Sequence, residues 1–499
     1  MSTASPRAAG VLLHPTSLPG PHGVGDLGPS ARRFLDWLAD AGVTLWQILP
    51  LVPPGPGESP YATTAALAGN PWLIDLEGLA AEGLLTAEDL VAPDFPLDDL
   101  DSQAMKAFKA PRLARAADAL LAGAHPAFAK ACEAFRKAHP WVDEAALFIA
   151  LKADHDGQPW WLWGPGLPER DPAALAAARK RLAVEVEREA VLQFLFDHQW
   201  QALRQHAANR GIRIIGDVPI YVDRDSVDVW ANRDQFRLDE AGNPVAVAGV
   251  PPDFFSDLGQ LWGNPLYDWE RMAADGHAWW VRRLRRAREL TDFVRLDHFR
   301  GFAAFWEVPA DAPDARGGRW VEGPGRALFD DIREALGELP LIAEDLGVID
   351  EPVVALRDGL GLPGMRVLQF AFGEAPDHPF LPHNYVEHTV AYTATHDNNT
   401  TLGWWQDTSA HVRDHVRRYL AVSGQDVVWD MIRATFASVA TMAIVPLQDV
   451  LCLDGRSRMN SPGVGEGNWG WRVRAQAFNT SLAARLRALS TLYGRAPAK

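Results

Sequence analysis

Four acidic residues each come directly after a short apolar run, and their types and spacing suit acid–base chemistry. They are Asp217 in Gly216–Pro219, Asp297 in Val294–Arg300, Glu344 in Ala343–Gly347 and Asp397 in Thr395–Thr400. Any one of them alone is most simply explained as a helix N-cap or a loop residue. Four acids at the ends of separate apolar runs, with Arg or His beside several of them, favour a functional site.

Two of these acids have neighbours that would give them opposite protonation states. Arg295 lies two residues before Asp297, and alternate side chains of a strand share a face, so the guanidinium can hold this carboxylate ionised. Glu344 follows the apolar run 341–343, and desolvation there would raise its pKa. Cleavage of a glycosidic bond needs one ionised and one protonated carboxyl group. We therefore expect Asp297 to be the nucleophile, Glu344 the acid, and Asp397 a group that holds sugar hydroxyls as the oxocarbenium-like state forms.

The runs that precede these acids are some of eight expected strands, and amphipathic helical stretches lie between most of them. The expected strands are Gly10–His14, Thr44–Leu51, Ile212–Ile220, Phe293–His298, Leu341–Leu346, Arg366–Phe372, Val390–His396 and Ala443–Val450. Alternation of strands and helices predicts a parallel sheet. About eight such units favour an α/β fold of the (β/α)8, or TIM, barrel type over a doubly wound sheet.

Two long intervals interrupt the alternation and are interpreted as insertions. We expect the first barrel units in 1–52, an inserted and mainly helical subdomain in 53–188, and barrel again in 189–220. An inserted lid or substrate loop then occupies 221–270, and the remaining barrel units with a C-terminal helix occupy 271–499. Long insertions are usually lids or binding loops, and barrel active sites lie at the carboxyl ends of the strands. Both insertions are therefore expected on the catalytic face.

Composition excludes several classes of partner. The 499 residues are 47% hydrophobic and 22% charged, which is typical of a globular protein. A net charge of −16 repels phosphate backbones and anionic lipid, so neither nucleic acid nor a membrane is an expected partner. Cys132 and Cys452 are too few for a disulfide framework, and with no secretory signal visible they predict a cytoplasmic protein. The 20 Trp residues are suited to contacting the faces of sugar rings or, equally, to filling an aromatic core.

One motif imitates a dinucleotide-binding turn. Gly23–Gly28 matches G-x-G-x-x-G, but Pro19 and Pro21 stiffen its approach and Asp26 would place a carboxylate where a pyrophosphate should bind. We interpret this segment as a tight turn at which the backbone passes close to a neighbour. The patterns of P-loops, serine hydrolases and zinc proteases do not occur. No cofactor and no metal are predicted.

Many separate motifs, spread from Leu13 to Arg472, resemble the amylomaltases, the 4-α-glucanotransferases also called disproportionating enzymes. The resemblance is carried by His14–Gly20, Trp46–Leu51, Ser59–Tyr61, Gly69–Pro71, Gly216–Tyr221, Pro251–Ser256, Gly259–Pro265, Arg458–Gly463 and Gly467–Trp469, together with the four segments that hold the acids. It covers nearly the whole chain.

The resemblance implies a retaining double displacement that needs no metal or organic cofactor. Asp297 would be the nucleophile, Glu344 the acid/base and Asp397 the acid that stabilises the transition state. The substrates would be α-1,4-glucans, such as maltooligosaccharides and possible amylose or glycogen branches. The segment 251–257 would cover the bond that is cut. The residues expected to bind the substrate are Tyr61, Asp217, Gln260, Trp262, Arg295, His298, His396, Phe254, Phe255 and Asn468.

The sequence departs from the family pattern at two places, and two other functions stay open. Ala62–Ala65 replaces a polar and aromatic run, which would change the shape of the acceptor pocket, and Asn399 replaces an Asp, which would remove a negative charge near Asp397. A plain α-glucan hydrolase on the same barrel stays open as an alternative. A non-catalytic glucan-binding protein is the second alternative, although the intact set of acids argues against it.

Overall fold

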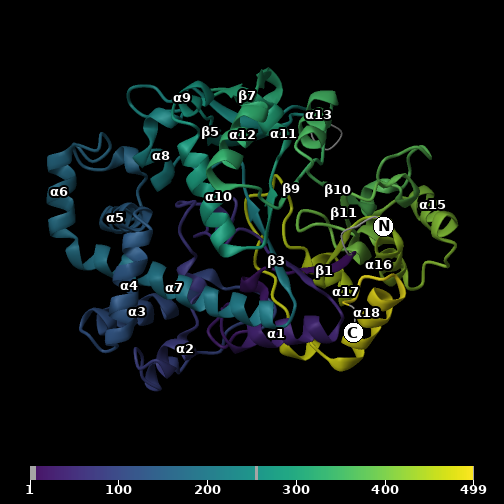
Figure 1. Ribbon diagram of the computed structural model, residues 1–499, viewed down its shortest axis with the longest axis horizontal. Coiled ribbons are helices and arrows are strands. Elements are labelled where there is room, and N and C mark those ends of the chain that lie inside the picture. Colours follow the sequence, from purple (N-terminus) through teal and green to yellow (C-terminus); the bar gives the residue numbers. More distant parts are fainter. Residues whose placement is uncertain (1–6, 253–256, 498–499) are drawn as a thin grey trace.

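Eight parallel strands form a barrel at the centre of the protein (Figure 1). The computed structural model describes residues 7–252 and 257–497. In chain order the barrel strands are β1 (Ala8–Leu12), β2 (Leu45–Gln47), β3 (Arg213–Val218), β6 (Phe293–Leu296), β9 (Leu341–Ala343), β10 (Gly364–Val367), β11 (Thr389–Tyr392) and β12 (Met442–Pro446).

The barrel strands pair in the order in which they occur along the chain, and the last strand returns to the first. β12 pairs with β1 from Ala8↔Met442 onward, and β1 pairs in turn with β2. Between β9 and β10 the backbone N–H of Ala343 donates to the carbonyl oxygen of Pro363 at 3.0 Å, which brings the remaining edges together. Gly10 lies where a side chain would crowd this wall, since a Cβ there would come 2.9 Å from Cγ1 of Ile444. The predicted (β/α)8 barrel is confirmed.

Helices cover the outside of the barrel in intervals between its strands, where the sequence predicts helical stretches. They are α1 (Pro29–Asp40), α7 (Ala183–Asn209), α10 (Ala278–Leu290), α12 (Gly325–Leu336), α13 (Glu351–Gly359), α15 (Ala410–Leu420) and α16 (Val427–Ala437). The apolar stripe of α1, which includes Phe34, Leu35 and Leu38, is buried, as its helical spacing requires. The connection from β10 to β11 contains short 3-10 turns in place of an α-helix, and the structure describes every residue of this connection.

The segment that was expected to be an inserted helical subdomain is mostly helical. It holds α2 (Leu76–Ala81), α3 (Ser102–Leu121), α4 (Pro126–Ala138), α5 (Trp141–Asp154) and α6 (Pro172–Arg181). α3, α4, α5 and α6 pack against the long helix α7, on the left of the barrel in Figure 1. The proposed boundaries at 52/53 and 188/189 stay predictions.

A second, antiparallel sheet was not predicted. Its strand order is β5-β4-β7-β8, with β4 (Ala246–Val250), β5 (Gln260–Pro265), β7 (Ala304–Pro309) and β8 (Arg319–Glu322). β4 and β5 belong to the expected insertion 221–270, whereas β7 and β8 come from the connection that follows β6. Pairing of Ala246 with Pro309 joins the two segments, so the expected lid region is continued by residues beyond 270.

The glycine-rich segment near the N-terminus is a tight turn, as expected. A Cβ on Gly25 would lie 2.1 Å from the carbonyl oxygen of Pro15, so the two backbones approach too closely for any side chain. Asp26 accepts a hydrogen bond from the backbone N–H of Gly28 at 3.1 Å, just before α1 begins.

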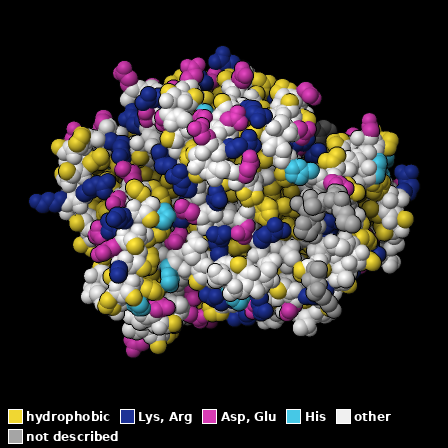
Figure 2. All heavy atoms as spheres, viewed as in Figure 1, with side chains coloured by type: hydrophobic (Ala, Val, Ile, Leu, Met, Phe, Trp, Pro, Cys, Tyr) yellow, Lys and Arg dark blue, Asp and Glu magenta, His cyan; other side chains and the backbone are white. Residues whose placement is uncertain are grey.

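The surface carries both signs of charge. Figure 2 shows basic and acidic side chains intermixed over the face that it displays. Among the helices of the described residues, none has the length and apolar character needed to cross a membrane.

Candidate active site

The four acids predicted from the sequence lie at the same end of the barrel. Asp217 is the second-to-last residue of β3, Asp297 directly follows β6, Glu344 directly follows β9 and Asp397 comes five residues after β11. Since all barrel strands are parallel, the carboxyl ends of β3, β6, β9 and β11 meet at one rim, which is where barrel enzymes place their active sites.

Arg295 joins two of these acids. Its Nη1 lies 2.6 Å from Oδ2 of Asp217 and 3.0 Å from Oδ1 of Asp297, and the hydroxyl of Tyr61 donates to the same Oδ2 of Asp217 at 2.8 Å. Burial by itself would lower the pKa of Arg295, but the Asp217 and Asp297 carboxylates raise it well above its ordinary value. A fixed positive charge therefore lies beside Asp297, whose side chain stays 25% exposed and accessible to a ligand.

Glu344 is the most deeply buried of the proposed catalytic groups. Burial raises the pKa of Glu344 to about 8, with Arg295 opposing the shift and Asp297 adding to it. The carboxyl group accepts hydrogen bonds from the backbone N–H of His298 at 2.7 Å and from that of Leu346 at 2.9 Å. Glu344 is thus a carboxyl group that keeps its proton near neutral pH, as a general acid must.

Asp397 lies at the rim with its side chain 41% exposed. Asn460 donates from Nδ2 to Oδ1 of Asp397 at 2.6 Å, and Nε2 of His396 lies 3.3 Å from Oδ2. Arg458 donates from Nη2 to the backbone carbonyl oxygen of Asp397 at 2.6 Å. Both the carboxylate and its peptide are therefore held by side chains from elsewhere in the chain.

Burial favours the neutral form of the two histidines that lie next to the acids. Burial lowers the pKa of His298 to about 4, although Asp297 opposes this, and burial likewise lowers the pKa of His396 in spite of Asp397. The His396 ring stacks on Tyr61, with 5.1 Å between ring centroids and 11° between planes. Neutral imidazoles can exchange hydrogen bonds with sugar hydroxyls without adding a charge to the pocket.

Aromatic and amide groups of the second sheet reach this rim. Trp262 in β5 is 37% exposed and lies edge-on to His298, with 4.7 Å between ring centroids. Its indole N–H donates to Oε1 of Gln260 at 3.1 Å. The antiparallel sheet therefore brings Trp262 and Gln260 next to the residues that follow Asp297.

Three further residues, Asn468, Phe254 and Phe255, are also expected to bind the substrate. The amide of Asn468 is engaged within its own loop, accepting from the backbone N–H of Ser461 at 2.9 Å and donating to the carbonyl oxygen of Val464 at 2.7 Å. Phe254 and Phe255 lie outside the described residues. The roles of all three in binding stay predictions.

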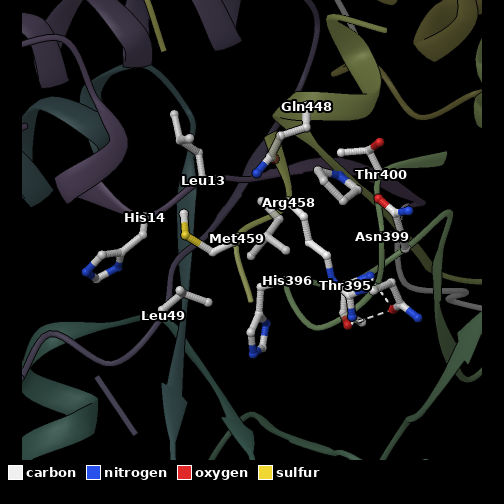
Figure 3. Close-up of a pocket in the computed structure, with 14 residues that line it drawn as sticks. Leu13, His14, Leu49, Thr395, His396, Asn399, Thr400, Gln448, Arg458 and Met459 are labelled. Atoms are coloured by element: carbon white, nitrogen blue, oxygen red, sulfur yellow. Dashed lines mark hydrogen bonds between the residues drawn. The ribbon is translucent and has the colours of Figure 1, made fainter. Parts of the chain in front are cut away.

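A pocket opens at the same end of the barrel, beside His396 (Figure 3). It is lined by residues at or just beyond the carboxyl ends of four neighbouring strands, together with two residues of a later loop. They are Leu12, Leu13 and His14 at β1, Leu49 after β2, Ala394, Thr395, His396, Asn398, Asn399 and Thr400 after β11, Pro446 and Gln448 at β12, and Arg458 and Met459 of the loop. In Figure 3 the side chain of Arg458 extends toward Thr395. Within the described residues, no group of three or more His, Cys, Asp or Glu side chains could hold a metal ion.

Three residues of the site were not among the predicted ones. Arg458 and Asn460 bind Asp397, and Trp469 packs against the rings of Tyr61 and His396 at centroid distances of 5.7 and 6.1 Å. Trp469 has a φ of +66°, which is unusual for a residue with a side chain. The motifs that carry them were noted in the sequence, but nothing in their residue types indicated contact with an acid more than 60 positions away.

The two departures from the family pattern are accounted for in part. Nδ2 of Asn399 donates to Oδ2 of Asp407 at 3.0 Å, a contact that an aspartate at position 399 would make repulsive. Thr63 donates from its hydroxyl to the carbonyl oxygen of Pro53 at 3.0 Å, which fixes the Ala62–Ala65 segment from within. The effect of this segment on the acceptor pocket stays a prediction.

Together, the fold and the site define a (β/α)8-barrel enzyme with an arginine-paired carboxylate and a protonated carboxyl group at the carboxyl ends of its strands. Residues 13–477 match the family described as 4-alpha-glucanotransferase. The 4-alpha-glucanotransferase of Thermus thermophilus is 50% identical over 494 residues, covering 97% of this chain and 98% of the other. That of Synechocystis is 47% identical, covering 98% of each chain.

The solved amylomaltase of Streptococcus agalactiae, in complex with acarbose, superposes with a TM-score of 0.96 at 37% identity, over 98% of this chain and 100% of the other. The chain therefore belongs to the 4-alpha-glucanotransferase family. It is an enzyme with glucanotransferase activity, and the alternatives of a plain hydrolase or a glucan-binding protein are not favoured.

Proposed function

We propose that the enzyme transfers α-1,4-glucan segments from a donor to the 4-hydroxyl of an acceptor glucan or glucose by a retaining double displacement. The observation that carries this proposal is the contrast between two neighbouring carboxyl groups. Asp297 is paired with the Arg295 guanidinium at 3.0 Å, whereas burial raises the pKa of Glu344 to about 8. This contrast supplies a nucleophile and an acid at one pH.

In the first displacement, an Asp297 oxygen attacks the anomeric carbon while the bond to the leaving oxygen breaks. Glu344 gives its proton to that oxygen, so the donor's reducing-end fragment leaves as an alcohol and the remaining segment is held as an ester of Asp297. Asp397 and Arg295 surround the sugar, and the negative charge of Asp397 stabilises the oxocarbenium-like transition state.

In the second displacement, the acceptor takes the place of the leaving group. Its 4-hydroxyl attacks the anomeric carbon, Glu344 accepts the hydroxyl proton, and the ester bond to Asp297 breaks. The two inversions restore the α configuration, and both carboxyl groups return to their initial protonation states.

Transfer must outcompete water, which is far more concentrated than any acceptor. An aromatic platform can hold the acceptor sugar by its face, and Trp262, 37% exposed beside His298, is suitably placed for this. Tyr61, stacked on His396, is proposed to contact the sugar in the cleavage subsite. The solved relative in complex with acarbose supports a sugar as the ligand.

The substrates are proposed to be maltooligosaccharides and the linear parts of larger glucans. With only two cysteines in 499 residues, we also propose that the enzyme works in the cytoplasm.

Incubation with maltotriose alone tests the proposal, with product lengths and total reducing ends followed together. We expect glucose and a ladder of shorter and longer oligomers at constant reducing ends. A rise in reducing ends with only shorter products would instead establish hydrolysis.

A further inference from the structure

Asp397 is the proposed catalytic group whose side-chain orientation depends most on distant residues. Its turn is fixed locally, because Thr395 donates from both its backbone N–H and its hydroxyl to Oδ1 of Asn398 at 2.9 Å. The backbone N–H of Asp397 donates to the Thr395 hydroxyl at 3.3 Å. These bonds hold the peptide, but they leave the exposed carboxylate free to rotate about its side-chain bonds.

Within the described residues, one side chain donates a hydrogen bond to this carboxylate, and a histidine ring lies near its other oxygen. Nδ2 of Asn460 donates to Oδ1 at 2.6 Å, and Nε2 of His396 lies 3.3 Å from Oδ2. The hydrogen bond from Asn460 therefore restrains rotation of the carboxylate. The Asn460 contact is the shorter, and it comes from a residue that is not part of the Asp397 turn.

Asn460 is itself held against the same turn through its backbone. Its N–H donates to the carbonyl oxygen of His396 at 3.1 Å, and its carbonyl oxygen accepts from Nε of Arg458 at 2.6 Å. The other end of Arg458, Nη2, binds the carbonyl oxygen of Asp397 at 2.6 Å. The Arg458–Asn460 segment therefore contacts the turn at three points, and the Asn460 amide is aimed at the carboxylate.

The choice of an amide has an electrostatic consequence. A Lys or Arg at this place would neutralise the carboxylate, and a negative charge is what the oxocarbenium-like transition state requires. A neutral amide orients the carboxylate and leaves its charge in place.

We infer that Asn460 is a positioning residue for the glucan-transfer reaction: it sets the orientation of the Asp397 carboxylate without touching the reacting atoms. This inference rests on the proposed role of Asp397. It assigns to Asn460 an effect on the turnover step and little effect on substrate binding.

The test uses release of fluoride from α-maltosyl fluoride, which reports formation of the glycosyl-enzyme whether water or a sugar receives the segment. For Asn460→Ala we expect kcat to fall about 10- to 100-fold, the range for loss of a hydrogen bond to a charged group. KM should change by less than about twofold, because the lost interaction acts on the transition state.

The pH dependence of kcat in Asn460→Asp gives a second readout. A change that only weakened the loop around residue 460 would not alter this pH dependence. The new carboxyl group faces Asp397, with His396, Arg458 and Tyr61 as the other titratable groups around the pair. Two carboxyl groups in contact share a proton as the pH falls, and the shared proton restores a donor to Asp397. The kcat of Asn460→Asp relative to the unmodified enzyme should therefore rise toward acid pH, whereas the ratio for Asn460→Ala should stay flat.

Asn209 is exposed at the end of α7, so Asn209→Asp makes the same chemical change away from the site. It is the matched control and should leave kcat unchanged. The inference would be overturned if Asn460→Ala kept more than about half of the kcat, if only KM changed, or if the two Asn460 variants had the same pH dependence. Absence of fluoride release by the unmodified enzyme would also overturn it. The proposed transfer function is judged separately, by the maltotriose products of the unmodified enzyme.

Discussion

The backbone N–H of His298 donates a hydrogen bond of 2.7 Å to Oε2 of Glu344. His298 follows Asp297 directly, so one peptide unit joins the two proposed catalytic carboxyl groups. His298 has a φ of +49°, a conformation that costs energy for a residue with a side chain and is found preferentially at functional sites. The carbonyl oxygen of Glu344 accepts from the backbone N–H of Phe299 at 3.1 Å, so the two loops are bound together at two points.

Removal of either proposed catalytic group should abolish turnover and leave the fold intact. Asp297→Asn loses the nucleophile and Glu344→Gln loses the transferable proton, and each change should reduce transfer from maltotriose by at least about a thousandfold. Product analysis and circular dichroism of the purified variants check this. Near-normal activity in either variant would remove that residue from the mechanism.

The activity should fall on the alkaline side as Glu344 loses its proton. Since burial raises the pKa of Glu344 to about 8, kcat/KM for maltotriose should decline above that pH. Fluoride needs no proton to leave, so the rate of fluoride release from α-maltosyl fluoride should lack this decline. If both substrates showed the same alkaline fall, another group would be responsible.

Glu344 should also make the stability of the fold depend on pH. Its pKa is raised from 4.5 to about 8 in the folded protein, so between these values the folded state keeps a proton that the unfolded state has lost. The stabilising contribution is therefore complete below about pH 4.5 and is lost as the pH rises through about 8.

Relative to Glu344→Gln, the free energy of unfolding should then fall by on the order of 5 kcal/mol across this window. Urea unfolding of the two proteins at a series of pH values measures the difference. Glu338→Gln, at a side chain that is 81% exposed, is the control and should show no such trend. A constant difference between the unmodified protein and Glu344→Gln would show that Glu344 is not buried as a neutral acid.

Loss of the Trp262 ring should shift the enzyme from transfer toward hydrolysis. If the ring contributes about 1.4 kcal/mol to holding the acceptor, Trp262→Ala should raise the ratio of hydrolysis to transfer about tenfold. Trp320 in β8 of the same sheet is 38% exposed, against 37% for Trp262, so Trp320→Ala is a matched control. An unchanged product ratio in Trp262→Ala would argue against an acceptor role.

Local sequence patterns predicted most of the barrel because its strands and helices follow local periodicity. All eight expected strands were found, although the later parts of 366–372 and 443–450 are helical turns, and α10 and α12 lie in intervals between strands where helical stretches were expected. The antiparallel sheet was missed because it depends on a non-local pairing. β4 and β7 are separated by more than 50 residues, and no local pattern in Ala246–Val250 indicates that Ala304–Pro309 is its partner.

The site shows the same division between local and distant contacts. The contact between Arg295 and Asp297 was predicted because side chains two residues apart in an extended chain point to the same face. The burial of Glu344 was predicted from its apolar flank. Two other contacts were not predicted: that of Arg295 with Asp217, and that of Asn460 with Asp397. Each joins two separate segments of the chain, and only the closed barrel brings those segments together.

The central claim is that Asp297 carries the glucan during transfer. Its most direct test is incubation of Glu344→Gln with α-maltosyl fluoride, followed by peptide mass spectrometry. Fluoride can leave without an acid, whereas the next step lacks its base, so the account predicts a maltosyl ester that accumulates on Asp297. Rapid turnover without an ester, or an ester on another residue, would contradict it.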